Sequence, residues 1–355
     1  MAGVYRFRLM GKRTANKRGK GGAGGGGGAG AAKSKRSAVA RSRASAGFTA
    51  TDLLTVFDLS AAELEDVLTL AMKLKLKRRP VSAASALKGC STILVFEKAS
   101  LRTRVSFEVG TTRLGGNAVY YQMQDSRIGE RESIKDFAMN LDRMVDCIVA
   151  RVYSQRALEE MARFSSVPVI NALSDEHHPC QALADVLTLR ERFGALRGLK
   201  VCYVGDGNNV AVSLMQACAL SGAEFTLLTP AEYSVDGEAV YDASMVAKDR
   251  GGSVRVEQDP AKVRNQAAIY TDTWVSMHQT HDLKKVELMR PYKVTAELMG
   301  NVCAADGVFM HCLPAHRGIE VTSEVIDGDR SVVYDQAENR VWAQMAVMMR
   351  LMGRG

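Results

Sequence analysis

The feature that most constrains the fold is the alternation of short apolar runs with stretches of helical periodicity. Runs rich in β-branched and aromatic residues are each followed by a segment typical of a helix. Strands that alternate with helices predict parallel α/β sheets, whose ligands gather beyond the carboxyl ends of the strands. We predict strands over 91–96, 117–121, 146–150, 167–171, 200–204, 225–230, 267–271 and 307–314, and helices over 51–57, 60–75, 103–114, 134–144, 156–164 and 182–193.

The length of 355 residues favours two domains. We predict two doubly wound parallel-sheet domains joined by helices, with the active site in the cleft between them. Residues 48–182 form the first domain, 183–330 the second, and 331–355 a C-terminal helix that packs back on the first. Because no apolar run reaches the ~18 residues of a transmembrane helix, we expect no membrane partner.

Positive charge is concentrated at the N-terminus. Of a net charge of +8, residues 1–47 contribute twelve Lys and Arg and no Asp or Glu, which leaves −4 for the remainder. The Gly-rich tract within this leader cannot offset its ordering entropy, so we expect the leader to be disordered. A basic, acid-free leader predicts a mitochondrial matrix protein, with a cytoplasmic location as the alternative. A basic arm that contacts nucleic acid or anionic membrane is a second interpretation, although we expect no nucleic-acid partner.

The cysteines show no paired metal-type spacing, and most lie in apolar runs. Buried thiols in a reducing compartment are therefore expected. The seven are Cys90, Cys147, Cys180, Cys202, Cys218, Cys303 and Cys312.

A candidate anion site lies where the strand 91–96 gives way to a helix. Ser100 stands at the N-cap position, and Arg102 and Arg104 add two cations to the free N–H groups and the positive end of the helix dipole. Phosphate is the most plausible ligand. The alternative is a surface turn with two solvated arginines, since Arg is usually exposed.

Two further strand ends add polar groups to the same edge. Arg151 ends one strand, and His178 and Gln181 follow the next. Arg binds phosphate oxygens bidentately, while His and Gln can hydrogen-bond a carbonyl and an amide, so the set fits a small ligand with one phosphate and one carbonyl. Singly, Arg151 could cap a helix and His178 could be a packed loop histidine.

The second half contains a Gly-rich turn that is not a dinucleotide-binding turn. Val210 replaces the third glycine of that motif, and the strand 225–230 ends without the acid that would hold a ribose. Asn209 in this turn, Asp272 with Ser276 and Met277, and Cys312 instead suit the ammonium and carboxylate of an amino acid. Alone, Asp272 could be a helix N-cap and Cys312 a buried thiol.

These motifs occur in the order seen in the aspartate/ornithine carbamoyltransferase family, which the chain resembles from about residue 49 to its end. The similarity is strongest to members that act on ornithine. The matching motifs are Ser100-Leu-Arg-Thr-Arg104, Arg151, His178-Pro-Cys-Gln181, Gly205-Asp-Gly-Asn-Asn209, Asp272 with Ser276-Met277, His311-Cys-Leu-Pro314 and Glu338-Asn-Arg340.

The resemblance implies transfer of the carbamoyl group of carbamoyl phosphate to the side-chain amine of L-ornithine, giving citrulline and phosphate. It implies a homotrimer with no metal or organic cofactor. Carbamoyl phosphate would bind to Ser100, Leu101, Arg102, Thr103, Arg104, Arg151, His178, Gln181 and Arg340, and ornithine to Asn209, Asp272, Ser276, Met277, Cys312 and Leu313. Arg151, His178, Asp272 and Cys312 would be catalytic, with Cys312 positioning the amine; we expect His311 to point away from it.

Two residues depart from the family pattern. Leu101 replaces the usual Thr and removes a hydroxyl near the phosphate, and His278 replaces a Gly in the ornithine-binding loop. Three hypotheses follow: an active ornithine-specific enzyme, a carbamoyltransferase for a different amine, or a catalytically impaired homologue that serves as a binding subunit.

Overall fold

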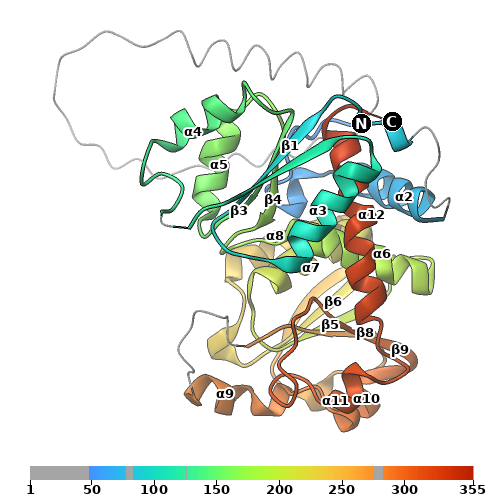
Figure 1. The fold of residues 1–355 in the computed structure, drawn as a ribbon. Helices are drawn as coiled ribbons and strands as arrows, with labels where there is room; N and C mark the ends of the chain where they lie inside the picture. The colour runs from blue at the N-terminus through green and yellow to red at the C-terminus, as the bar shows by residue number, and fades with distance from the viewer. Residues whose placement is uncertain (1–47, 77–82, 125, 275–282, 355) are drawn as a thin grey trace.

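Two parallel sheets form the two halves of the molecule (Figure 1), in a computed structural model that describes residues 48–76, 83–124, 126–274 and 283–354. The strand orders are β2-β1-β3-β4 and β7-β6-β5-β8-β9. The strands are β1 (Ser91–Phe96), β2 (Asn117–Gln122), β3 (Cys147–Arg151), β4 (Val169–Leu173), β5 (Lys200–Val204), β6 (Glu224–Leu228), β7 (Ser253–Glu257), β8 (Gln266–Thr271) and β9 (Cys303–His311). Every neighbouring pair is parallel, which confirms the predicted α/β class.

Helices cover the sheets and connect successive strands. They are α2 (Ala61–Leu76), α3 (Leu101–Arg113), α4 (Ile134–Leu141), α5 (Gln155–Phe164), α6 (Pro179–Phe193), α7 (Asn209–Ser221), α8 (Gly237–Arg250), α9 (Leu283–Met289), α10 (Ala296–Val302), α11 (Ser323–Ile326) and α12 (Val333–Leu351). Short 3-10 turns are η1 (Val56–Asp58), η2 (Ala83–Ser85), η3 (Ala231–Tyr233), η4 (Pro260–Lys262) and η5 (Arg290–Tyr292). None of the helices in these described segments is long and apolar enough to span a bilayer.

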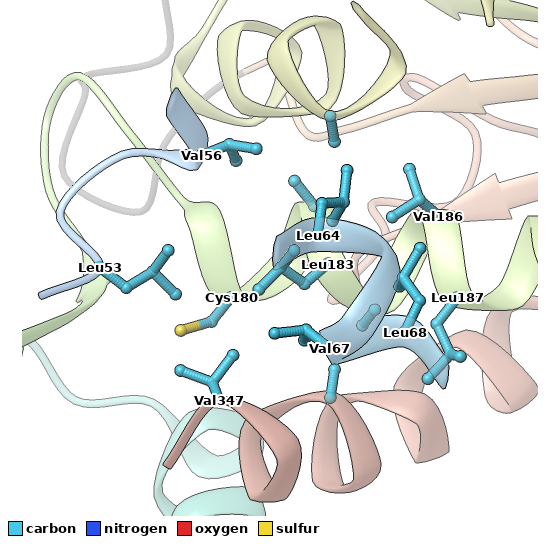
Figure 2. Close-up of a cluster of buried hydrophobic side chains, with 14 of the residues drawn as sticks. Leu53, Val56, Leu64, Val67, Leu68, Cys180, Leu183, Val186, Leu187 and Val347 are labelled. Atoms are coloured by element: carbon cyan, nitrogen blue, oxygen red, sulfur yellow. The ribbon is translucent and has the colours of Figure 1, made fainter. Parts of the chain in front are cut away.

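A shared hydrophobic core holds the two halves together. The long helix α12 runs from the second sheet back to the first half and packs on α2, α3 and α6 (Figure 1). Figure 2 shows part of this core, with Leu64, Val67 and Leu68 of α2, Cys180, Leu183, Val186 and Leu187 of α6, and Val347 of α12. Truncating a buried leucine typically removes about 2–5 kcal/mol of stability. A core with many such side chains therefore holds the two sheets firmly in place relative to each other.

Local sequence signals account for where several elements begin. The Ser60 N–H donates to Glu63 Oε2 (2.7 Å) and the Glu63 N–H donates to Ser60 Oγ (3.2 Å), so a capping box starts α2. β1 begins and ends at the predicted residues: its β-branched and aromatic run follows the turn at Gly89 and ends before the polar Glu97.

The predicted helix over 51–57 is wrong. Leu53 instead pairs with Ile170 of β4: its N–H donates to the Val169 carbonyl (3.0 Å), and its own carbonyl accepts from the Asn171 N–H (2.8 Å). The β4 edge captures this segment, and only the short turn η1 follows. Elsewhere, α8 and β7 lie in a stretch for which no element was predicted.

Candidate active site

The predicted site residues lie at the points where the chain order reverses within each sheet. This reversal occurs between β1 and β3 in the first sheet and between β5 and β8 in the second. Connections leave such a switch point on opposite faces, so a crevice opens at the carboxyl ends of the strands. Arg102 follows β1, Arg151 ends β3, Asn209 follows β5 and Asp272 follows β8. The topology therefore brings both sets of predicted ligands to binding edges.

The N-terminus of α3 forms the anion-binding end of the first half. Ser100 is its N-cap, and the Ser100 hydroxyl accepts from the Thr103 N–H (3.4 Å) and donates to Thr103 Oγ1 (2.9 Å). Arg340 of α12 donates from an NH2 group to the same Thr103 oxygen (2.8 Å). The last helix thus delivers a guanidinium to a helix terminus that favours negative charge.

Arg102, Arg151 and Arg340 form what we call the arginine cluster. Burial lowers the pKa of Arg151 to about 10, with repulsion from Arg340 and Arg102 as further causes. Burial also lowers the pKa of both Arg340 and Arg102. Within the described residues none of the three forms an ion pair, and Nε of Arg151 and of Arg340 is buried without a hydrogen-bond partner. Such a cluster suits an anion with several oxygens.

Two side chains of the phosphate motif point elsewhere. The Arg104 guanidinium stacks over the Tyr120 ring, 3.8 Å from its centroid, and Arg104 Nε donates to Glu108 Oε1 (3.0 Å). The Leu101 side chain is 75% exposed. The structure therefore brings Ser100, Thr103 and Arg102 together at the site, but neither the Arg104 side chain nor the Leu101 side chain.

The N-terminal turn of α6 supplies His178 and Gln181. Helix α6 starts at Pro179 rather than at the predicted residue 182, so His178 is its N-cap. Burial, with repulsion from Arg340 and Arg151, holds the pKa of His178 well below its usual range, and the imidazole is neutral at physiological pH. His178 Nδ1 and Gln181 Oε1 are buried and have no hydrogen-bond partner among the residues that the structure describes. A neutral imidazole and an amide carbonyl are suited to a polar but uncharged group.

A hydrogen-bonded set of side chains forms the second half of the site. The Cys312 thiol donates to Asp272 Oδ1 (2.9 Å), and Asn208 Nδ2 donates to Asp272 Oδ2 (2.8 Å). Burial and the adjacent Asp272 carboxylate raise the pKa of Cys312 well above its usual value, so the thiol is protonated. Asn209 instead donates to the Ser174 carbonyl (2.6 Å) and links this half to the first. Ser276, Met277 and His278 lie outside the described residues.

The glycines of the 205–209 turn are required for close packing. Gly205 has φ +123°, and a Cβ there would lie 2.8 Å from Trp274 Nε1. A Cβ on Gly207 would lie 2.5 Å from the Val235 nitrogen. The two glycines are therefore explained by the packing of this turn, which carries Asn208 and Asn209. They are not evidence for a nucleotide-binding site.

His311 lies closer to the site than expected. One of its ring nitrogens and the side-chain donor atoms of Asp272 and Cys312 all lie within 4.8 Å of one another. Its Nε2 is paired with Glu320 (3.2 Å), and Nδ1 accepts from the Leu313 N–H (2.9 Å). Since both ring nitrogens are engaged, His311 shapes the turn through Leu313, and the trio is not prearranged as a metal site.

The two halves of the site face each other. Two hydrogen bonds hold them side by side: Asn209 Nδ2 donates to the Ser174 carbonyl (2.6 Å), and the His178 N–H donates to Ser213 Oγ (2.7 Å). A ligand bound to the arginine cluster would therefore lie beside the Asp272–Cys312 pair.

Comparison with known proteins assigns the family. The carbamoyl-phosphate-binding domain model of the aspartate/ornithine carbamoyltransferases matches residues 51–191, and the aspartate/ornithine-binding domain model matches residues 197–351. The chain belongs to the aspartate/ornithine carbamoyltransferase family. It is 46% identical over 299 residues to an ornithine carbamoyltransferase of Shewanella oneidensis, covering 84% of this chain and 98% of that protein.

Solved structures from the family have the same fold. Ornithine carbamoyltransferase from Pyrococcus furiosus superposes with a TM-score of 0.82 at 45% identity, covering 86% of this chain and 97% of that one. A mitochondrial ornithine carbamoyltransferase from Coccidioides immitis gives 0.75 at 35% identity, covering 84% and 96%.

Sequence reasoning missed the groups that support the site. Asn208 was noted in the turn but not assigned to the ligand set, and Asp185 and Gln336 were not considered. Asp185 is an acid within the otherwise apolar stretch 182–187 of α6, a signal that was present in the sequence. No comparable signal marks Gln336, because its partners lie far away in the chain.

Proposed function

We propose that this protein is an ornithine carbamoyltransferase, which transfers the carbamoyl group of carbamoyl phosphate to the side-chain amine of L-ornithine. The main support is the arrangement of the site: the arginine cluster lies at one switch point and the Asp272–Cys312 pair at the other, and hydrogen bonds join the two halves beside them. Family membership and relatives named ornithine carbamoyltransferase support the same substrates.

Carbamoyl phosphate lies with its phosphate on the α3 N-terminus and Arg102. Its carbonyl oxygen lies against Arg151 and His178, and its amide group donates to Gln181 Oε1. Each placement uses a group that the geometry leaves available, because His178 Nδ1, Arg151 Nε and Gln181 Oε1 are buried and have no partner in the described segments of the chain. Arg340 strengthens the phosphate end through its position on Thr103.

The reacting amine of ornithine must be neutral, because an ammonium has no lone pair for attack. A free side-chain amine has a pKa near ~10.4, and the cations of the arginine cluster favour its deprotonation. The amine attacks the carbamoyl carbon, and Arg151 and His178 stabilise the resulting oxyanion. The bond from carbon to the phosphate oxygen then breaks, and the departing phosphate takes the amine proton.

Cys312 positions the amine and does not attack. Its thiol has a raised pKa and donates a hydrogen bond to Asp272, so the thiolate that nucleophilic catalysis would need is disfavoured. The exposed Leu101 also weakens the case for an impaired homologue, because the motif hydroxyl that it replaces would not have pointed into the site.

A steady-state assay tests the proposal. With carbamoyl phosphate and a panel of amines, we expect turnover with ornithine to citrulline and phosphate, and loss of that turnover in Arg102→Ala. Turnover with another amine but not ornithine supports the alternative acceptor, and no turnover with any amine contradicts a catalytic role.

We propose that the chain assembles as a homotrimer through α3 and the edge strand β2. Leu101, Val105 and Val109 form an exposed apolar stripe on α3, and Val119 and Tyr121 are exposed on β2 beside it. Light scattering should give three times the mass of one chain, and Val105→Glu should lower it. Met245→Glu, at a similarly exposed position on α8 (46% against 45%), should leave the mass unchanged.

We also propose that the leader directs the protein to the mitochondrial matrix. The support is its twelve basic residues without an acid. Fusion of residues 1–47 to a fluorescent protein should give matrix fluorescence, and a cytoplasmic signal would contradict the proposal.

A further inference from the structure

Behind the proposed active site lies a buried chain of hydrogen bonds that joins the two halves of the molecule. Gln181 Nε2 donates to Asp185 Oδ1 (2.8 Å), and Gln336 Nε2 donates to the same oxygen (2.7 Å). Gln336 Oε1 in turn accepts from the His311 N–H (3.0 Å). All four residues are at most 1% exposed. This chain of hydrogen bonds therefore connects α6, through α12, to the end of β9.

The direction of each bond fixes the Gln181 amide. A carboxylate oxygen can accept but not donate when ionised, so Asp185 selects the orientation in which Gln181 presents its NH2 group to it. Gln181 Oε1 is then turned to the other side, where it is buried and no described residue hydrogen-bonds to it. Without Asp185 the amide could rotate and place a donor where an acceptor is needed.

The second arm of the chain acts on the other half of the site. Gln336 holds the backbone N–H of His311, which immediately precedes Cys312, and His311 Nδ1 holds the Leu313 N–H. The turn that carries the thiol is thereby tied to the same carboxylate as Gln181. The buried Asp185 side chain thus fixes the position of the carbamoyl-binding half of the site relative to the amine-binding half.

We propose that Asp185 is a positioning residue, which orients the Gln181 amide toward the carbamoyl group and, through Gln336, fixes the end of β9 that carries Cys312. This inference rests on the proposed function for the identity of the ligands. Burial raises the pKa of Asp185 to about 7, and the two amide donors oppose that rise. Since Oδ1 takes both donors, the contacts survive whether or not Oδ2 carries a proton.

Two substitutions at Asp185 separate hydrogen bonding from charge. Asp185→Asn keeps an acceptor oxygen but removes the charge, whereas Asp185→Leu keeps the branched shape of the side chain but removes the acceptor. We expect kcat/KM for carbamoyl phosphate within about threefold of the unmodified protein for the Asn variant. We expect a loss on the order of 10- to 100-fold for the Leu variant, the size seen when an orienting partner of a ligand is lost.

A double-mutant cycle that combines Asp185→Leu with Gln181→Ala shows whether Asp185 acts through Gln181. If it does, kcat/KM for carbamoyl phosphate is no lower in the double variant than in Gln181→Ala alone. A purely structural role of Asp185 would multiply the two losses instead.

The second arm is tested at Gln336, with a matched control on the same helix. Gln336→Met should raise the KM for ornithine more than that for carbamoyl phosphate, because Gln181 keeps its bond to Asp185. Gln344→Met alters a buried glutamine of α12 that has no hydrogen-bond partner in the described part of the chain, and should leave both constants unchanged.

The outcomes distinguish this inference from the proposed function. If the unmodified protein makes no citrulline, the proposed function fails. If it is active but Asp185→Asn is as impaired as Asp185→Leu, or the cycle is multiplicative, or Gln336→Met equals Gln344→Met, the positioning role is overturned. Should Asp185→Leu fail to fold, the comparison of Gln336→Met with Gln344→Met decides.

Discussion

Replacing Arg151 with Met should make the protein more stable and less active. Burial and two neighbouring cations lower the pKa of Arg151 from 12.5 to about 10, which corresponds to a penalty of roughly 3 kcal/mol for its charged form. Arg151 Nε has no hydrogen-bond partner to lose within the described residues. We therefore expect Arg151→Met to raise the free energy of unfolding, in buffer without phosphate, by up to about 3 kcal/mol.

The same substitution removes a donor to the developing oxyanion. We expect kcat to fall by a factor on the order of 100–1000. Urea unfolding without phosphate and a citrulline assay measure the two effects. Arg156→Met, at an exposed position on α5, is the control and should change neither quantity appreciably. The reasoning holds that the buried arginines repel one another and lower the stability of the protein, but are needed for catalysis. A less stable Arg151→Met protein, or one with unchanged turnover, would refute it.

The remaining predictions concern the Cys312 thiol, the Arg104 guanidinium and the half-buried His177. Cys312→Ser should keep turnover within about tenfold, and iodoacetamide should modify Cys312 far more slowly than a free thiol, because its pKa is raised; rapid modification argues against the assignment. Arg104→Met should leave the KM for carbamoyl phosphate nearly unchanged while Arg102→Met raises it strongly; equal effects would show that both side chains bind phosphate. Burial lowers the pKa of His177 to about 4, so its contribution to stability is complete above pH 6.5 and is lost as the pH falls toward 4. His177→Asn should reduce the loss of unfolding free energy between pH 7.5 and 5.5 by about 1.3 kcal/mol, and an unaltered pH dependence in urea titrations contradicts this.

Much of the fold could be predicted because its signals are local. The runs 91–96 and 200–204 became β1 and β5 with the expected bounds, since Glu97 follows the first run and Gly205 follows the second. Ser100 caps its helix as predicted, and the helix predicted from residue 60 is capped by Ser60, because capping depends on a few consecutive residues. Because neighbouring strands were predicted to be parallel, their carboxyl ends were expected at the same edge of each sheet.

What could not be predicted depends on contacts between distant segments. Nothing near residues 51–57 indicated that β4 would capture Leu53. Arg104 belongs to the phosphate motif, yet Tyr120 on the adjacent strand and Glu108 one turn away draw its guanidinium outward. Likewise the bond between Gln336 and Asp185 joins residues 151 positions apart, and only the folded chain shows it.

A crystal structure with carbamoyl phosphate and an ornithine analogue lacking the side-chain amine tests the central claim most directly. The account predicts the phosphate on Arg102 and the N-terminus of α3, the carbamoyl oxygen on Arg151 and His178, and the end of the analogue's side chain directed to Cys312. Carbamoyl phosphate bound away from the arginine cluster, or the two ligands bound on separate surfaces, would contradict it.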